Sequence, residues 1–161
     1  MDELISDNAK AQISEKTKDI LRTFNIDDRQ SEPHVGNQNF AERGWKDTKT
    51  KVNHLLNSKG APGKAWLLAL QYMCEIQNHT AVKSLNWRTP VEWLLGYTPD
   101  ITTFLQFEFW EPVYYSKYDA RFPQDSTELL GRFVGISENV GNAMTFKVLS
   151  SEEKVINRAV V

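Results

Sequence analysis

Two carboxylates, Asp7 and Glu42, are the residues of this chain best suited to metal chemistry. Asp7 follows the short apolar segment 4–6, which is typical of a strand, and Glu42 lies near the start of a predicted long helix. Thirty-four residues separate them. Two-metal sites for phosphoryl transfer need carboxylates that converge on Mg²⁺ from different elements of one fold. A strand end and a helix start, joined by a helix and a loop, can provide that convergence.

Glu42 also has a purely structural explanation. Asn39 can cap the helix, and a glutamate three residues later would complete a capping box and interact favourably with the helix dipole. Taken alone, Glu42 is better explained by this role than by metal binding. The residues around it and its interval from Asp7 are what favour a ligand.

Basic residues are concentrated on the helix that begins near Glu42. Lys46 and Lys49 recur at helical spacing from Glu42 and so share its face, and Arg43 is its neighbour in sequence. These three cations are candidates for contacts with DNA phosphates. The alternative is a solvated helix face, in which a Glu42–Lys46 pair stabilises the helix by about 0.2–0.5 kcal/mol.

The overall charge does not by itself indicate a nucleic-acid-binding protein. The 161 residues include 19 Lys and Arg against 21 Asp and Glu, for a net charge of −2. Residues 1–61 carry ten basic and ten acidic residues, and residues 62–161 carry nine and eleven. DNA-binding domains usually take much of their affinity from an excess of Lys and Arg. Only the helix after Glu42 departs from this balance.

Several other classes of protein are not expected. No apolar run is long enough to span a membrane, and the N-terminus lacks the pattern of a signal peptide. Cys74 is the single cysteine, which excludes an internal disulfide and fits a reducing, intracellular compartment. One cysteine and three histidines cannot supply a zinc knuckle.

The first two thirds of the chain predict helices that would position these residues. An amphipathic helix is expected over 10–24, a short strand around Ile26, and a polar loop over 27–39. The helix bearing Glu42 should end at Gly60–Gly63. Its apolar stripe consists of Ala41, Trp45, Val52, Leu55 and Leu56. A buried helix is expected over 65–76, and a short helix with Thr89 as cap, Pro90 first and Gly96 as its end.

From Phe104 onward the pattern changes to short runs of strand-forming residues. These runs cover 107–115, 129–136, 143–149 and 154–161, with Gly141-Asn142 as a hairpin turn. They predict a small β-rich region, either a sheet or a small barrel.

Several short motifs occur in a characteristic order along the chain. They are Ser6-Asp7-Asn8, Ser31-Glu32-Pro33-His34, Gln38-Asn39-Phe40-Ala41-Glu42-Arg43, Thr89-Pro90-Val91-Glu92 and Gly96-Tyr97-Thr98-Pro99-Asp100. In this order and spacing, residues 6 to about 103 resemble the second half of the catalytic core of copia-type retrotransposon integrases. No single motif is specific, and the resemblance depends on their arrangement over nearly the whole chain.

The resemblance implies an α/β fold: part of a ribonuclease-H-like integrase core over residues 1–103, mostly its helices with the front strands missing, then a β-rich region over 104–161. Asp7 would be the family's second aspartate and Glu42 its glutamate, both catalytic and both ligands of Mg²⁺ or Mn²⁺. The family's first aspartate lies on an earlier strand. Because six residues precede Asp7, we expect it to be absent and the chain alone to be inactive.

The same resemblance implies DNA as partner, both retroelement ends and host target, with Arg43, Lys46 and Lys49 at its backbone. It also implies possible homo-oligomers and an intracellular, nuclear location. Two alternatives stay open. One is a transposon-derived module that binds nucleic acid or oligomerises without catalysis. The other is a fragment that folds only in part, because its helices lack the strands they would cover.

Overall fold

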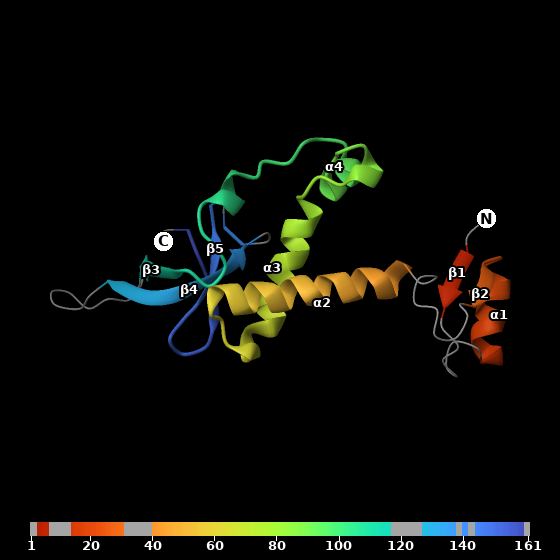
Figure 1. Cartoon of the computed structure of the whole chain (residues 1–161), viewed down its shortest axis with the longest axis horizontal. Helices are drawn as coiled ribbons and strands as arrows, with labels where there is room; N and C mark the ends of the chain where they lie inside the picture. Colours follow the sequence, from red (N-terminus) through yellow and green to blue (C-terminus); the bar gives the residue numbers. More distant parts are fainter. Residues whose placement is uncertain are drawn as a thin grey trace. The chain divides into compact units, whose positions relative to one another are not determined.

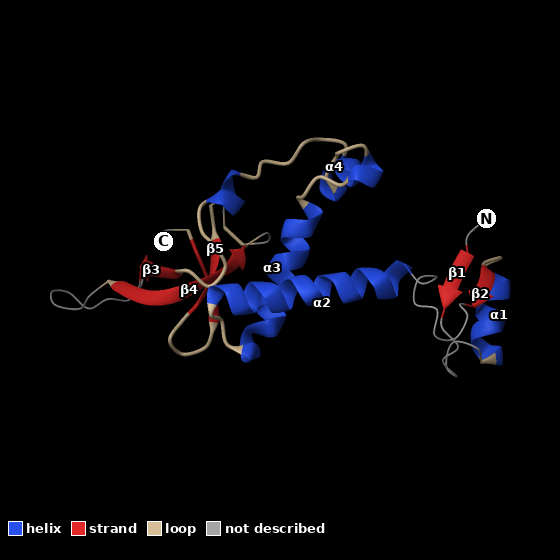
Figure 2. Cartoon of the chain, viewed as in Figure 1, coloured by secondary structure: helices blue, strands red, loops and turns tan. Residues whose placement is uncertain are grey.

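The computed structural model describes residues 3–6, 14–30, 40–116, 127–137, 140–141 and 144–159. The chain divides into two compact units, Met1–Asp47 and Thr48–Val161. It is a mixed α/β protein, in which helices and a small parallel sheet precede a four-stranded antiparallel sheet (Figures 1 and 2). The α/β class and the β-rich C-terminal region are thus confirmed.

The first unit contains a strand–helix–strand arrangement. Strand β1 (Glu3–Ser6) pairs in parallel with β2 (Asp27–Gln30), and α1 (Glu15–Thr23) connects them. Ser14 caps α1, because its hydroxyl accepts a 3.3 Å hydrogen bond from the Thr17 amide. The helix therefore begins at Glu15, later than predicted. The short strand predicted around Ile26 is found one residue later, as β2. The loop predicted over 27–39 is therefore wrong for its first four residues, where pairing with β1 makes a polar segment a strand.

Helix α2 (Phe40–Lys59) follows, and it ends where glycine and proline predict. Gly60 has a φ of +60°, and the Ala61 amide donates to the Leu56 carbonyl at 2.9 Å. Val52 and Leu56 are buried and Leu55 packs against the same core. The predicted apolar stripe is wrong for two members, because Ala41 and Trp45 are both exposed.

Two further helices lie in the second unit. Helix α3 (Trp66–Asn78) follows the short 3-10 turn η1 (Gly63–Ala65) and buries Ala69 and Tyr72, as its apolar sequence predicts. Helix α4 (Pro90–Leu95) begins as predicted, because the Thr89 hydroxyl accepts a 3.0 Å hydrogen bond from the Glu92 amide. It ends at Gly96, whose φ is +77°. The 3-10 turns η2 (Lys83–Leu85) and η3 (Thr102–Leu105) flank it.

The second unit is completed by an antiparallel sheet in the order β3-β4-β5-β6. Its strands are β3 (Pro112–Ser116), β4 (Glu128–Ile136), β5 (Phe146–Leu149) and β6 (Val155–Arg158). The strand predicted over 107–115 is wrong for residues 107–111. There the chain turns, with Trp110 at a φ of +69°, and Phe109 enters the core. Of the predicted hairpin turn, Gly141 has a positive φ and Asn142 lies outside the described residues.

Aromatic side chains form the centre of the core between α3 and the sheet. The ring of Phe133 lies 6.2 Å from Tyr72, 5.5 Å from Phe107 and 5.9 Å from Phe146, measured between centroids. Gly131 on β4 permits close packing, since a Cβ there would lie 2.4 Å from a Val148 methyl carbon. This core takes side chains from both sides of the predicted boundary between residues 103 and 104, and that boundary stays a prediction.

Two charged side chains tie the sheet to its surroundings, one to α3 and one across to another strand. Lys147 on β5 forms a 3.3 Å ion pair with Glu75 on α3. Arg158 on β6 donates a 3.2 Å hydrogen bond to the Ser116 carbonyl of β3, and its guanidinium lies 5.8 Å from the Tyr115 ring centroid. Because β3 and β6 are the two outer strands, this contact requires the sheet to curve strongly.

Candidate functional site

Asp7 lies outside the described residues, so its side chain has no assigned place. The structure does describe the strand that leads to it. Strand β1 ends at Ser6, the residue directly before Asp7, and runs parallel to β2. The strand expected to precede the aspartate is therefore present.

Glu42 lies in the first turn of α2 and is exposed. A carboxylate there interacts favourably with the amide groups at the helix start. In the same turn, the Arg43 guanidinium lies 5.2 Å from the centroid of the exposed Phe40 ring. The proposed cap, Asn39, lies outside the described residues. Glu42 is thus accessible to a ligand, and its structural role at the helix start remains an equally good explanation of its identity.

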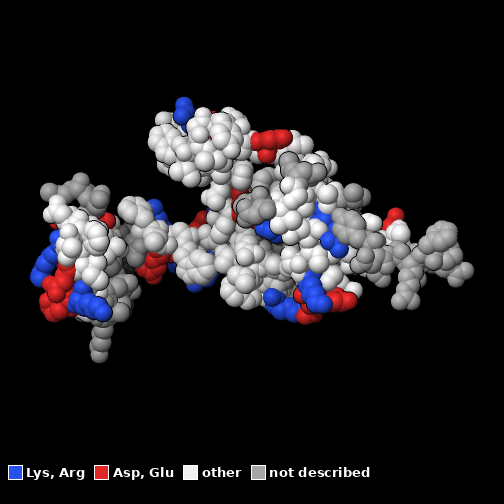
Figure 3. Space-filling model, turned by 180° about the vertical axis from the view of Figure 1, so that it is seen from behind, with Lys and Arg blue, Asp and Glu red and all other residues white. Residues whose placement is uncertain are grey.

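The basic residues predicted to contact DNA are exposed on α2. Lys46 and Lys49 lie one and two turns after Glu42 on the same helix face. Lys59, at the end of α2, instead forms an ion pair with Glu108. On the face drawn in Figure 3, blue and red side chains are intermixed, as the net charge of −2 suggests. The described residues therefore offer a short basic helix face and no broad basic surface in that view.

The described residues do not fit a complete divalent-metal site. Among them, no group of three or more His, Cys, Asp or Glu side chains is arranged to hold an ion. A paired-ion centre needs several carboxylate oxygens on each Mg²⁺. Glu42 alone supplies two, and Asp7 lies outside the described part. No reaction step through a metal follows from this arrangement.

The histidines that the structure describes include one with a clear packing role. The His79 Nδ1 atom lies 2.8 Å from the Glu75 carbonyl oxygen, and its ring packs against that of Phe104 with the centroids 4.5 Å apart and the planes tilted by 41°. His34, the last residue of the motif at 31–34, lies outside the described residues.

The sequence predicts the short helix α4 and its ends, but not the apolar surface that lies around it. This surface exposes large aromatic and aliphatic side chains. They are Trp87, Trp93 and Tyr97, together with Leu94 and Leu95. Leu94 is 82 % exposed, although leucine is usually buried in soluble domains. The available signal was local composition, because a six-residue helix with apolar residues on all sides cannot bury them all.

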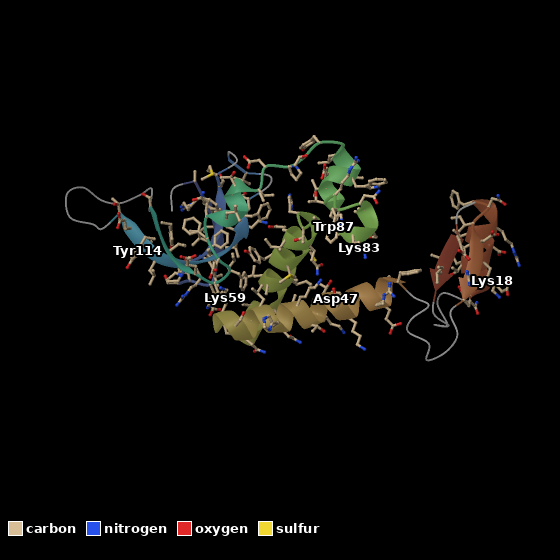
Figure 4. All side chains as sticks on the ribbon, turned by 45° about the horizontal axis from the view of Figure 1, so that its top comes forward. Lys18, Asp47, Lys59, Lys83, Trp87 and Tyr114 are labelled. Carbon is tan, nitrogen blue, oxygen red and sulfur yellow. The ribbon has the colours of Figure 1, made fainter. Side chains whose placement is uncertain are left out.

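Trp87 lies in a loop with an unusual backbone. Asn86 and Trp87 have φ values of +55° and +64°, a region that costs roughly 1–2 kcal/mol for each L-residue other than glycine. Asparagine tolerates this region, whereas tryptophan rarely adopts it. The loop holds the indole 70 % exposed, beside Lys83 in Figure 4.

No family model matches this chain, and no curated protein matches its sequence. In the part of the chain that the structure describes, no helix is long and apolar enough to cross a membrane. The resemblance to copia-type integrases thus stays a prediction.

Proposed function

We propose that this chain is a segment of a copia-type retrotransposon integrase, derived from a ribonuclease-H-like core and functioning in DNA integration. One observation carries the proposal. A parallel strand–helix–strand unit has its first strand ending directly before Asp7, and a long helix then begins with Glu42 in its first turn. The resemblance implies this order of elements. The agreement concerns the order of neighbouring elements, so it does not depend on where the two compact units lie.

In this proposal Asp7 and Glu42 are ligands of Mg²⁺ or Mn²⁺, and Arg43, Lys46 and Lys49 contact the DNA backbone. The DNA partners are retroelement ends and host target, and the location is nuclear. In the family, polynucleotidyl transfer requires a third carboxylate, the first aspartate, which lies on an earlier strand. The resemblance assigns none of these 161 residues to that position. We therefore expect no joining of DNA ends by this chain alone, in either Mg²⁺ or Mn²⁺.

Metal binding by the full chain tests the proposed pair of ligands. Titration with Mn²⁺, followed by electron paramagnetic resonance of the free ion, should show weak binding that Asp7→Asn and Glu42→Gln each abolish. Asp47→Asn is the matched control, since Asp47 is another exposed acidic residue of α2 (Figure 4). Loss of binding in the control as well, or in neither ligand variant, contradicts the assignment.

Duplex DNA binding tests the basic helix face. Replacing Lys46 and Lys49 with glutamine should weaken binding and reduce the slope of log K against log salt by about one per lost phosphate contact. Lys51→Gln is the control, because Lys51 is exposed on a different face of α2. An equal effect in the control would show that only total charge matters.

The second candidate is a non-catalytic module that binds nucleic acid or oligomerises. The exposed apolar residues of α4, which are Trp93, Leu94 and Leu95, favour oligomerisation, because soluble monomers rarely expose neighbouring apolar side chains of this size. Sedimentation velocity over a range of concentrations would detect self-association. If DNA binding and self-association are both unchanged by chelator and by Asp7→Ala with Glu42→Ala, this second function is preferred.

A further inference from the structure

We propose that the loop from Val82 to Arg88 is a binding element for single-stranded nucleic acid, with Trp87 as a stacking platform for one base. This goes beyond the metal-dependent function, because it involves neither Asp7 nor Glu42. The loop lies entirely within the second compact unit.

The loop is closed and held by its own hydrogen bonds. The Val82 amide donates to the Arg88 carbonyl at 3.0 Å, and the Trp87 amide donates to the Val82 carbonyl at 3.1 Å. The Asn86 amide donates to the Lys83 carbonyl at 3.1 Å. Lys83 directly follows Val82 and Trp87 directly precedes Arg88, so the Val82–Arg88 bridge brings their backbones near each other, and Figure 4 labels both in the same region. The indole is therefore presented by a fixed backbone.

The conformation of the loop explains why Trp87 projects outward. Its φ of +64° follows one of +55° at Asn86, so two consecutive residues adopt the left-handed region. Such a conformation persists only where surrounding contacts enforce it, and it is found preferentially at functional sites. Here it leaves 70 % of a large aromatic residue in solvent. The left-handed backbone conformation is therefore not explained by burial of Trp87 in the core of this unit.

The charges nearest to Trp87 in the sequence favour an anionic partner, and the first acidic residues on either side are Glu75 and Glu92. Residues 76–91 contain Lys83 and Arg88 and no aspartate or glutamate, and both cations are exposed. An accessible aromatic ring with a cation on either side of it in the sequence, Lys83 and Arg88, suits an unpaired base and its neighbouring phosphates. A base within a duplex has both faces stacked, so the indole cannot use it. The partner is thus a single strand, and stacking accepts DNA and RNA alike.

Binding of labelled dT20 to the full chain, measured by fluorescence anisotropy in EDTA, tests the proposal. Trp87→Ala should weaken binding about tenfold, as expected for the loss of one stacked base. Trp87→Phe should retain most of the affinity, because it keeps an aromatic face. Trp93→Ala is the matched control: this indole is 61 % exposed on α4 and should not affect binding.

Lys83→Gln provides a second measurement that does not depend on the ring. It should lower affinity and reduce the slope of log K against log salt by about 0.7, the value for one phosphate of a single strand. Comparing the affinities for labelled rU20 and dT20 shows whether the chain prefers RNA or DNA. A duplex of the same length, added as competitor, should compete poorly.

Several results would overturn the proposal. They are the absence of dT20 binding, equal losses in Trp87→Ala and Trp93→Ala, or a Lys83→Gln variant with unchanged affinity and salt slope. Self-association that Trp87→Ala abolishes, without dT20 binding, would assign the loop to contact with a second copy. Circular dichroism of each variant establishes folding, and Lys83→Gln remains decisive if Trp87→Ala unfolds. The dT20 assay is run in EDTA and tests Trp87 and Lys83, whereas the metal assay tests Asp7 and Glu42, so this proposal and the metal-dependent one fail independently.

Discussion

Two adjacent tyrosines on β3 provide a direct test of how the sheet packs. Tyr115 is 4 % exposed and Tyr114 is 63 % exposed, because successive side chains of a strand point to opposite faces. The pairing of Tyr114 with Leu130 and of Tyr115 with Leu129 sets these faces. Substituting each tyrosine with alanine should therefore have very different effects on the free energy of unfolding.

The expected magnitudes follow from burial and contacts. Truncation of a large buried aromatic residue to alanine costs about 3–5 kcal/mol. Tyr115 also loses its contact with the Arg158 guanidinium, which adds about 0.5–1 kcal/mol. Tyr114 loses little burial, so its substitution should cost at most about 1 kcal/mol, the range of β-sheet propensity. We expect a difference of at least about 2 kcal/mol between the two variants.

Guanidinium unfolding followed by far-ultraviolet circular dichroism gives both free energies under the same conditions. The thermal midpoint of Tyr115→Ala should fall by roughly 10–20 °C, given the size of the second unit. A shift of the register by one residue would exchange the two faces. Equal costs for the two variants, or a larger cost at Tyr114, would refute the assigned packing of β3 on β4.

Three further outcomes are expected. Gly131→Ala should destabilise the protein by about 1–3 kcal/mol in denaturant unfolding, because its methyl group would overlap Val148, whereas Gly44→Ala on α2, with open space around it, should stabilise by up to about 1 kcal/mol. Thr89→Ala should cost about 1 kcal/mol in the same assay through loss of the α4 cap. Burial raises the pKa of Tyr72 above 10.0, and the negative charges of Glu108 and Glu75 contribute. Tyr72 in the unfolded chain then loses its proton before folded Tyr72 does, so the free energy of unfolding should fall as pH rises above about 10. The fall between about pH 9 and pH 10.5 should be smaller in Tyr72→Phe than in the unaltered protein.

Signals that act within a few residues predicted the structure well. The cap at Thr89 and the stop at Gly60 depend on local hydrogen bonds and backbone angles, and both occur as predicted. The position of Glu42 in a first helical turn follows from the same kind of signal. These features need no knowledge of distant parts of the chain.

Features that depend on distant contacts were predicted less well, and the extent of β2 is one of them. Strand β2 has four exposed polar residues, and only its pairing with β1 makes it a strand. Trp45 belongs to an apolar stripe by spacing, yet the core that covers Val52 does not cover it. The meeting of Asp7 with Glu42 is likewise a non-local property, and it stays a prediction. The conformation of Trp87 was not foreseeable, because tryptophan has almost no tendency to adopt a positive φ.

The Arg158 side chain has a consequence for association between copies of this chain. An outer strand offers unpaired backbone groups, to which a strand of another molecule can add. By donating to the Ser116 carbonyl, Arg158 occupies one backbone acceptor on β3. The same contact fits a curved sheet and not the flat form that favours strand addition. A single guanidinium near the end of the last strand thus discourages intermolecular β-pairing at the opposite side of the sheet.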